Sequence, residues 1–117
     1  MSDFGKLLTA VVTPFDNNGV LSTDTLWRLC RKLVHEKSDG LVLSGTTGES
    51  PNLSKDDREI IYSTAKDSVG DKVNIIAGTG TYSTKESIEY TKMANDLGVD
   101  GITVSYTHLT LPTILLV

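Results

Sequence analysis

The sequence predicts an α/β protein built on a parallel β-sheet, because short apolar runs alternate with stretches of helical periodicity. The predicted strands begin about 30 residues apart, which is the length of one βα unit. The helical stretches start with capping residues and end near glycine. The predicted order is therefore β-α-β-α-β-α-β, with right-handed crossovers between parallel strands.

Four apolar runs are the predicted strands, at residues 7–13, 40–44, 73–77 and 100–105. The first is ended by Pro14 and is nearly continuous in apolar and β-branched residues. Such a run differs from the alternating pattern of a half-exposed strand, and it favours a strand covered on both faces.

Three helices are predicted from caps and apolar stripes. The capping residues, in chain order, are Ser22 or Thr23, the pair Ser54 and Asp57, and the pair Ser83 and Glu86. The stripes consist of Leu26, Leu29, Cys30, Leu33 and Val34 in the first helix, Ile61, Ala65 and Val69 in the second, and Ile88, Thr91, Ala94 and Leu97 in the third. We expect the second helix to stop near Gly70 and the third at Gly98.

Composition excludes several classes of function. The chain has 117 residues, of which 38% are hydrophobic and 22% charged, and its net charge is −4. This acidic balance gives no general attraction to nucleic acid or anionic membranes. A single cysteine, Cys30, excludes an internal disulfide and a cysteine-based metal cluster, and it favours a cytoplasmic setting. We see neither a signal peptide nor an apolar run long enough to span a membrane.

Two α/β architectures compete, a doubly wound sheet and a (β/α)8 barrel. A doubly wound sheet that binds a dinucleotide usually carries G-x-G-x-x-G after its first strand, and here that strand runs into Pro14. Residues 78–80 supply only G-x-G, and there is no phosphate-binding G-x-x-x-x-G-K-[ST] loop. A barrel places its site on loops that follow the strands, and the polar, glycine-containing segments 45–50 and 78–83 fit that plan.

Residues 45–50, Gly-Thr-Thr-Gly-Glu-Ser, are the strongest functional signal. Glycines allow a ligand to approach backbone N–H groups closely, and two threonines add hydroxyl donors. Such a loop can hold a small carboxylate. Taken by itself, the segment could equally be an ordinary βα turn.

Chain length and the final residues predict a fragment. A barrel needs about 250 residues, and this chain supplies only the first three and a half βα units. We therefore predict that residues 1–105 are the N-terminal part of a barrel. Residues 106–117 contain no Asp, Glu, Lys or Arg and are interrupted by Pro112. We interpret them as a divergent tail of foreign sequence, the alternative being a further extended segment.

Residues 4–105 resemble the N-terminal third of the dihydrodipicolinate synthase family, within the pyruvate-dependent class I aldolase and lyase superfamily. Four segments carry the resemblance, at residues 9–15, 45–54, 76–84 and 98–104. Each segment alone is weak, and the four together in order are specific for the superfamily. The adjacent threonines at 46 and 47 favour the synthases over the N-acetylneuraminate lyases.

The resemblance implies a (β/α)8 barrel lyase of lysine and diaminopimelate biosynthesis. Such an enzyme binds pyruvate as a lysine Schiff base and condenses it with L-aspartate 4-semialdehyde to give 4-hydroxy-tetrahydrodipicolinate. It implies no metal or organic cofactor, a cytoplasmic location and a homotetramer. The alternatives are another pyruvate-dependent aldolase, such as an N-acetylneuraminate lyase or a 2-keto-3-deoxy sugar acid aldolase, or a truncated product without activity.

The resemblance also assigns roles within the 45–50 loop. Thr47 matches the threonine that binds the pyruvate carboxylate, and Thr46 matches the threonine that links two tyrosines in a proton relay. Gly45 and Gly48 would let the loop wrap around the carboxylate, and Glu49 would brace the loop. The Schiff-base lysine and the relay tyrosines are expected outside this chain, which we therefore expect to be inactive alone.

Departures from the family pattern begin at Tyr106, which stands where the family has proline, and continue to His108, which stands where it has the second relay tyrosine. We transfer no role to either. Other candidates have structural interpretations. Cys30 belongs to the core, His35 is a solvated residue near a helix C-terminus, and residues 78–83 form a turn and helix cap. The lysines lie on polar faces or turns.

Overall fold

The computed structural model describes residues 4–104, which form a four-stranded parallel sheet and three α-helices. The strands are β1 (Leu8–Ala10), β2 (Gly40–Leu43), β3 (Asn74–Gly78) and β4 (Gly101–Thr103). The helices are α1 (Thr23–His35), α2 (Lys55–Val69) and α3 (Thr84–Asp96), and a 3-10 turn, η1 (Ser50–Asn52), precedes α2. The predicted order of strands and helices is confirmed, and the predicted tail at 106–117 lies outside the described residues.

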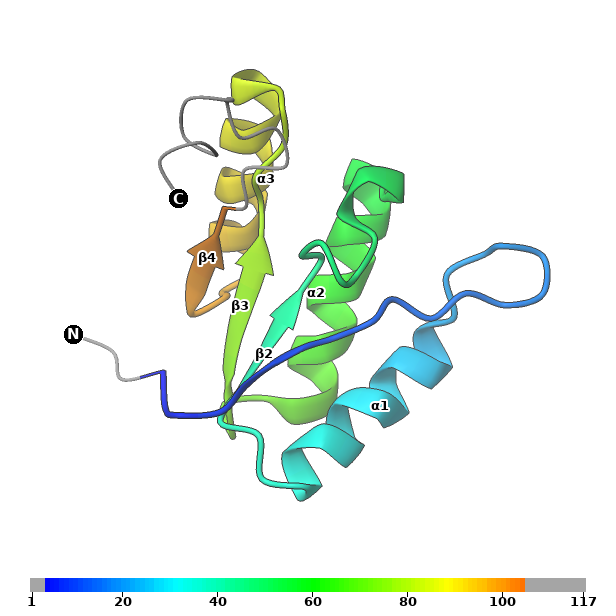
Figure 1. The fold of residues 1–117 in the computed structure, drawn as a ribbon, viewed down its shortest axis with the longest axis vertical. Coiled ribbons are helices and arrows are strands. Elements are labelled where there is room, and N and C mark those ends of the chain that lie inside the picture. The colour runs from blue at the N-terminus through cyan, green and yellow to red at the C-terminus, as the bar shows by residue number, and fades with distance from the viewer. Residues whose placement is uncertain (1–3, 105–117) are drawn as a thin grey trace, which may run out of the picture.

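The strands stand in the sheet in the same order as in the chain, β1-β2-β3-β4, and every pair is parallel. A doubly wound sheet reverses its direction of growth, so that its strand order is not sequential. The observed order is instead that of successive strands in a (β/α)8 barrel. Figure 1 shows the three helices along one side of the sheet, which is what same-handed crossovers between neighbouring strands produce.

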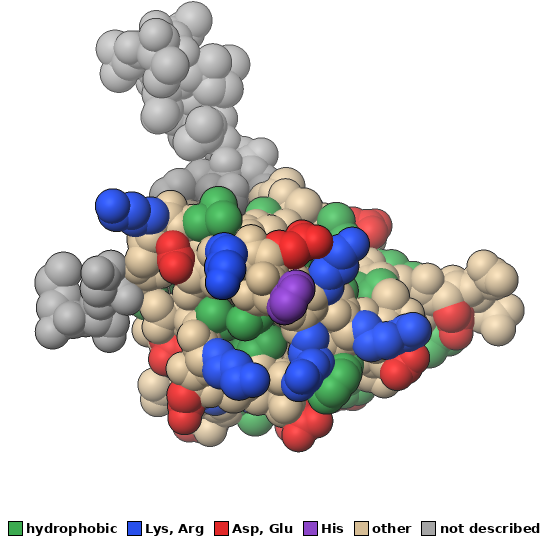
Figure 2. All heavy atoms as spheres, turned by 90° about the horizontal axis from the view of Figure 1, so that it is seen from below, with side chains coloured by type: hydrophobic (Ala, Val, Ile, Leu, Met, Phe, Trp, Pro, Cys, Tyr) green, Lys and Arg blue, Asp and Glu red, His purple; other side chains and the backbone are tan. Residues whose placement is uncertain are grey.

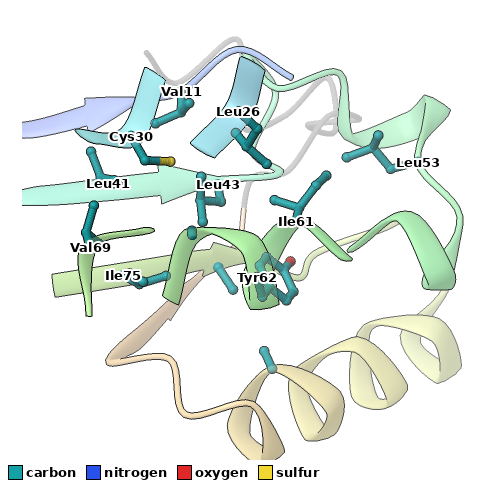
Figure 3. Packing of buried hydrophobic residues seen from close by; sticks show 13 residues of the cluster. Val11, Leu26, Cys30, Leu41, Leu43, Leu53, Ile61, Tyr62, Val69 and Ile75 are labelled. Atoms are coloured by element: carbon teal, nitrogen blue, oxygen red, sulfur yellow. The ribbon is translucent and has the colours of Figure 1, made fainter. Parts of the chain in front are cut away.

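The core lies between β2 and β3 and the inner sides of α1 and α2 (Figure 3). Alternate residues of the two central strands point to the helices, so that Leu41, Leu43, Ile75 and Ala77 are at most 1% exposed. The helices contribute the predicted apolar positions Leu26 and Cys30 from α1, and Ile61, Ala65 and Val69 from α2. The predicted stripes of the first two helices are therefore confirmed.

The two outer strands are shorter than predicted, and part of each is exposed. β1 covers three residues, and the side chains of Leu8 and Val12 are 41% and 54% exposed. β4 is also limited to three residues, with Ile102 47% exposed. The prediction that the first strand is covered on both faces is wrong for the described residues, because the three helices lie along one side of the sheet (Figure 1) and Leu8 and Val12 point to the other.

The predicted apolar stripe of α3 is confirmed in part, since Ala94 is buried and Leu97 packs against the core but Ile88 does not. Tyr90 and Ala94 are the buried residues of this helix, whereas Ile88 is 51% exposed. At 3.6 residues per turn, Ile88 and Tyr90 point about 200° apart around the helix axis. The prediction placed Ile88 in the core because it is apolar, whereas Tyr90 packs its ring against the guanidinium of Arg58 on α2.

Helix termini agree with the predicted caps in part. Ser54 and Asp57 form the complete capping box, each side chain accepting from the other residue's backbone N–H. Ser83 accepts from the backbone N–H of Glu86, but its own N–H donates to the hydroxyl of Thr81 instead of to Glu86. The predicted second capping box is thus only half formed.

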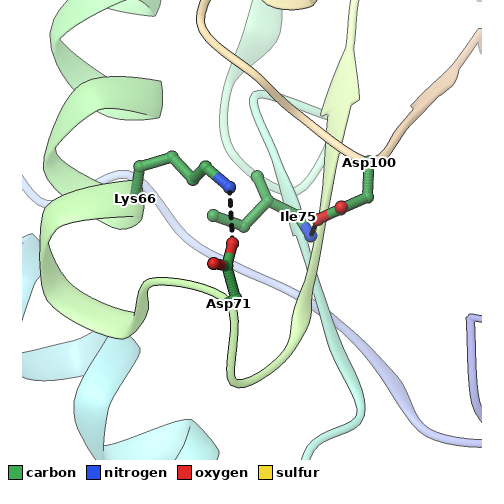
Figure 4. Close-up of polar contacts among 4 residues, drawn as sticks. All are labelled: Lys66, Asp71, Ile75 and Asp100. Carbon is green, nitrogen blue, oxygen red and sulfur yellow. Dashed lines mark hydrogen bonds and ion pairs between the residues drawn. The ribbon is translucent and has the colours of Figure 1, made fainter.

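Carboxylates close the end of the sheet at which the strands begin. Asp39 Oδ2 accepts from the backbone N–H groups of Lys6 and Leu7, at 2.8 Å each. Asp100 Oδ2 accepts from the N–H of Ile75 at 2.8 Å (Figure 4). These bonds satisfy backbone donors that have no strand partner there.

The same end of the molecule carries charges of both signs. Figure 2, seen from below, shows acidic and basic side chains interspersed around a small group of hydrophobic ones. One pair, Lys66 and Asp71, is in contact at 3.3 Å.

Among the helices of residues 4–104, none combines the length and the hydropathy that crossing a membrane requires.

Candidate functional site

The loops that follow β2 and β3 lie side by side at the other end of the sheet, where the strands end. Leu43 pairs with Ala77, so the two loops start side by side. Together with the ends of α2 and α3 they surround a cavity of about 300 Å³. Its lining includes Gly45, Thr46, Arg58, Gly78, Tyr82 and Tyr90. Both segments that the sequence singled out, 45–50 and 78–83, thus contribute to one cavity.

The 45–50 loop is a compact turn stabilised by its own backbone. The N–H groups of Gly48 and Ser50 both donate to the carbonyl of Gly45, at 3.0 and 3.2 Å. Glu49 adopts a left-handed conformation with φ of 60°, and its carboxylate accepts from the amide of Asn52 at 3.4 Å. This contact supports the predicted bracing role of Glu49.

The four predicted site residues differ in exposure and in what they face. Thr46 and Thr47 are both exposed, and Thr46 lines the cavity whereas Thr47 does not. Gly48 is buried against the exit of β1, where its carbonyl accepts from the hydroxyl of Thr13 at 2.6 Å. A Cβ on Gly48 would lie 3.1 Å from that hydroxyl oxygen, whereas a Cβ on Gly45 would meet only Val42, at 3.7 Å. A side chain at 48 would therefore be crowded, whereas one at 45 would not.

The carbonyl of Gly78, the last residue of β3, accepts from two side chains. Arg58 Nη1 donates to it at 2.8 Å and Ser44 Oγ at 2.9 Å, and the Tyr62 hydroxyl lies 3.4 Å from the same oxygen. Ser44 and Tyr62 are also joined by a short hydrogen bond. A Cβ on Gly78 would lie only 2.5 Å from the carbonyl oxygen of Ser44, so this close approach of two strand ends requires glycine.

Tyr62 is neutral in this setting. Burial raises the pKa of its phenol, and the hydrogen bond with Ser44 and the nearby charge of Arg58 oppose that rise only in part. The phenol therefore acts as a hydrogen-bonding group that keeps its proton.

Arg58 and Tyr62 were not predicted as site residues. The signal was available, because both positions continue the stripe of Ile61, Ala65 and Val69 at helical spacing and should face the sheet. Arginine in such a stripe is unusual, since charged side chains are almost never fully buried unless paired. The side chain of Arg58 is nonetheless 1% exposed.

The 78–83 loop is held mainly by its own hydroxyls. Thr79 is fully buried, and its hydroxyl accepts from that of Thr91 at 2.9 Å. Thr81 bonds both to the carbonyl and to the N–H of Ser83. These contacts support the interpretation of this segment as a turn and helix cap that borders the cavity.

The remaining sequence candidates have the expected structural places. Cys30 is fully buried, and burial raises the pKa of its thiol to about 11, which makes it unreactive. His35 is exposed in the last turn of α1. Residues 4–104 contain no group of three or more His, Cys, Asp and Glu side chains arranged to hold a metal ion.

Comparison with known sequences identifies relatives over nearly the whole chain. The family model described as the dihydrodipicolinate synthetase family matches residues 3–108. The 4-hydroxy-tetrahydrodipicolinate synthase of Desulforudis audaxviator (strain MP104C) is 51% identical over 100 residues, covering 86% of this chain and 34% of that protein. The chain thus spans about a third of the length of the curated relatives it matches.

Solved structures give the same result for the fold. Dihydrodipicolinate synthase from Bacillus anthracis superposes with a TM-score of 0.86 and 37% identity, over 94% of this chain and 39% of that chain. N-acetylneuraminate lyase from Mycoplasma synoviae superposes with a TM-score of 0.79 and 30% identity, over the same shares of the two chains. The predicted fold is confirmed, since the described sheet is the N-terminal part of a (β/α)8 barrel.

Proposed function

The chain belongs to the dihydrodipicolinate synthetase family, and from this premise we propose that it supplies the pyruvate-binding loop of a Schiff-base lyase. The reaction is the condensation of pyruvate with L-aspartate 4-semialdehyde to 4-hydroxy-tetrahydrodipicolinate. One observation carries the proposal. The Gly45–Ser50 segment forms a turn at the carboxyl end of the strands, which is where barrel enzymes bind substrate.

Within this loop, Thr47 binds the pyruvate carboxylate and Thr46 passes a proton. Both threonines are exposed at the surface of the turn, so a ligand reaches their hydroxyls without displacing core residues. A hydroxyl donates and accepts at once, and it therefore transfers a proton without ionising itself. Gly45 and Gly48 frame the pair, and Gly48 fixes the turn against Thr13.

The Schiff-base lysine of the proposed reaction comes from a strand outside this chain. A lysine that forms a Schiff base near neutral pH has a pKa lowered by burial or by another cation. None of the lysines in residues 4–104 is buried. The least exposed of them, Lys66, lies in the last turn of α2 and pairs with Asp71. This chain alone is accordingly proposed to be inactive.

A second candidate function is that of an N-acetylneuraminate lyase, which the superposition on the Mycoplasma synoviae enzyme favours. The synthase is the first choice, because the curated relatives at 45–52% identity are named as synthases. A homotetramer, a cytoplasmic location and independence of any cofactor belong to the proposal as well.

A chimera tests the substrate choice. Residues 4–104 would replace the corresponding segment of a synthase of known activity, and turnover would be measured with pyruvate and L-aspartate 4-semialdehyde. We expect turnover of the semialdehyde and no cleavage of N-acetylneuraminate. Within the chimera, Thr47→Val should raise KM for pyruvate, and Thr46→Val should lower kcat. Cleavage of N-acetylneuraminate would instead establish the second candidate function.

Borohydride trapping tests the location of the lysine. The 117-residue chain would be incubated with pyruvate and borohydride and analysed by mass spectrometry. We expect no stable adduct on this chain and a single adduct on the chimera, on a lysine outside residues 4–104. A mass increase on any lysine of this chain that depends on pyruvate would contradict the proposal.

A further inference from the structure

Arg58 is a buried cation whose charge no carboxylate balances in the described part of the chain. The ion pairs of residues 4–104 are Arg28–Asp24, Lys32–Glu36 and Lys66–Asp71. The guanidinium of Arg58 is bound instead by neutral oxygens and by the ring of Tyr90, 4.2 Å from its centroid. Its Nε is buried without a hydrogen-bond partner.

Burying the charge of Arg58 in this way is unfavourable for the stability of the fold, so stability does not explain it. Burying a charge is unfavourable unless it is well paired, and an apolar side chain of similar volume often serves packing at least as well. The position belongs to the apolar stripe of α2, where leucine or methionine would fit the helical pattern. What an apolar side chain could not supply is the set of hydrogen bonds that the guanidinium makes.

The oxygens that Arg58 binds belong to two different loops. Nη1 donates to the carbonyl of Gly78 at 2.8 Å, at the end of β3. Nη2 donates to the carbonyl and to the hydroxyl of Ser50, both at 2.9 Å, at the end of the 45–50 loop. The planar fork of arginine reaches the oxygens of both residues at once, which the single ammonium of lysine cannot reproduce.

The start of the same loop is tied to the same carbonyl. Ser44, directly before Gly45, donates its hydroxyl proton to Gly78 O at 2.9 Å. It does so from a left-handed conformation with φ of 53°, which a serine rarely adopts. The loop is thus fastened to Gly78 at its first end by Ser44 and at its last end by Arg58, while Thr46 and Thr47 between them stay exposed.

From this geometry we propose that Arg58 is the positioning residue of the pyruvate-binding loop. It holds Ser50 against the end of β3 and thereby fixes where the hydroxyls of Thr46 and Thr47 stand. Arg58 acts through the loop and makes no contact with substrate in this role. The inference rests on the proposed function for its substrate, and on the hydrogen bonds of Arg58 for the fixing of the loop.

Two substitutions on α2 separate positioning from packing. Arg58→Lys keeps the charge and loses the fork, whereas Ile61→Val removes one methylene from the same helix and leaves the fork intact. Pyruvate affinity and the ¹⁵N order parameters of the Thr46 and Thr47 amides would be measured for the wild type and both variants. Arg28→Gln, on the exposed surface of α1, is the control for loss of an arginine.

We expect Arg58→Lys to weaken pyruvate binding about tenfold and to lower the order parameters from about 0.85 towards 0.6, values typical of rigid and flexible backbone. Ile61→Val and Arg28→Gln should leave both quantities unchanged. Equal effects of Arg58→Lys and Ile61→Val on pyruvate affinity and loop order would overturn the inference, because packing would then explain them.

The two proposals fail in different ways. If the wild-type chain does not bind pyruvate while Arg58→Lys still loosens the loop, the substrate is wrong and the positioning role stands. If Arg58→Lys does not fold, Ser50→Ala removes one of the two bonds from Arg58 to the loop's end. A two- to threefold loss of pyruvate affinity is then expected, and an unchanged affinity and loop order would overturn the positioning role.

Discussion

The two ends of the sheet differ in which side-chain groups bond to the backbone, acceptors at one end and donors at the other. Where the strands begin, the carboxylates of Asp39 and Asp100 accept from backbone N–H groups. Where β3 ends, the backbone carbonyl of Gly78 accepts from side-chain donors. The difference follows from the polarity of a parallel sheet, in which unpaired groups at either end must be satisfied by side chains. At the first end the polar side chains only bond to the backbone of the sheet, whereas at the second end they hold two loops around a cavity.

This contrast predicts different consequences for substitutions. Changes at the first end should lower stability and leave the Gly45–Ser50 loop as it is. Changes around Gly78 should alter the loop as well as stability, because the loop is fastened there at both of its ends.

The largest effect is expected for Gly78→Ala. The new Cβ would stand 2.5 Å from the carbonyl oxygen of Ser44 and 2.9 Å from the Cα of Gly45, both of them backbone atoms. Relieving this overlap requires the strand ends to separate, and we expect a loss of about 3 kcal/mol in the free energy of unfolding. Urea unfolding followed by circular dichroism measures it.

Gly45→Ala is the matched control in the same cavity wall. Its Cβ would meet only Val42, at 3.7 Å, which is ordinary contact. We expect a change within about 0.5 kcal/mol. Equal destabilisation by the two variants would show that the Gly78 contact is not what closes this end.

A moderate effect is expected for Asp100→Ala at the first end. The variant removes the acceptor of the Ile75 N–H, whose bond is 2.8 Å long. We expect a loss of about 1.5 kcal/mol in the free energy of unfolding, typical of a hydrogen bond to a charged group. The amide resonances of residues 45–50 should not move in a ¹H–¹⁵N spectrum. A shift there would break the proposed independence of the two ends.

A smaller loss of stability is expected for Tyr62→Phe. The hydroxyl of Tyr62 bonds to that of Ser44 beside the carbonyl of Gly78, where Arg58 and Ser44 remain as donors. We expect a loss of about 1 kcal/mol together with shifts of the Gly45 and Thr46 amides. If stability falls without any change in those amides, the link between Gly78 and the loop is weaker than we infer.

The smallest effect concerns Asp39 and appears only with pH. Hydrogen bonds from Leu7 and Lys6 lower the pKa of its carboxyl below the ordinary value of about 3.9. Folding thus favours the ionised form. The stabilisation is fully present above the ordinary value and is lost as pH falls through the lower pKa of the folded state. Asp39→Asn should therefore lower Tm at pH 7 and make little difference near pH 2. A Tm difference that is equal at both values would contradict this assignment.

The sequence was sufficient for the order of strands and helices, because the caps and the buried stripes of α1 and α2 are local signals. Cys30 was placed in the core by its position in such a stripe, and it is fully buried. Local signals failed where the neighbours decide. Ile88 is apolar but faces away from the core, and Leu8 is exposed because it points to the side of the sheet opposite the helices.

The functional end was predictable only in part. Residues 45–50 form a recognisable segment, and their place beside the 78–83 loop follows from the parallel arrangement. The role of Arg58 could not be predicted, because its partners Ser50 and Gly78 come together only when α2 packs on the sheet. A charged residue in an apolar stripe was the one local sign of it.

The most direct test of the account is a titration of the ¹⁵N-labelled chain with pyruvate, followed by amide resonances at both ends of the sheet. We predict the largest shifts at Gly45, Thr46 and Thr47, and none at Leu7 and Ile75. Saturable shifts confined to the end of the sheet near Asp39 and Asp100 would contradict the claim that the Gly45–Ser50 loop binds pyruvate. The absence of any shift in the loop at saturating pyruvate would contradict it as well.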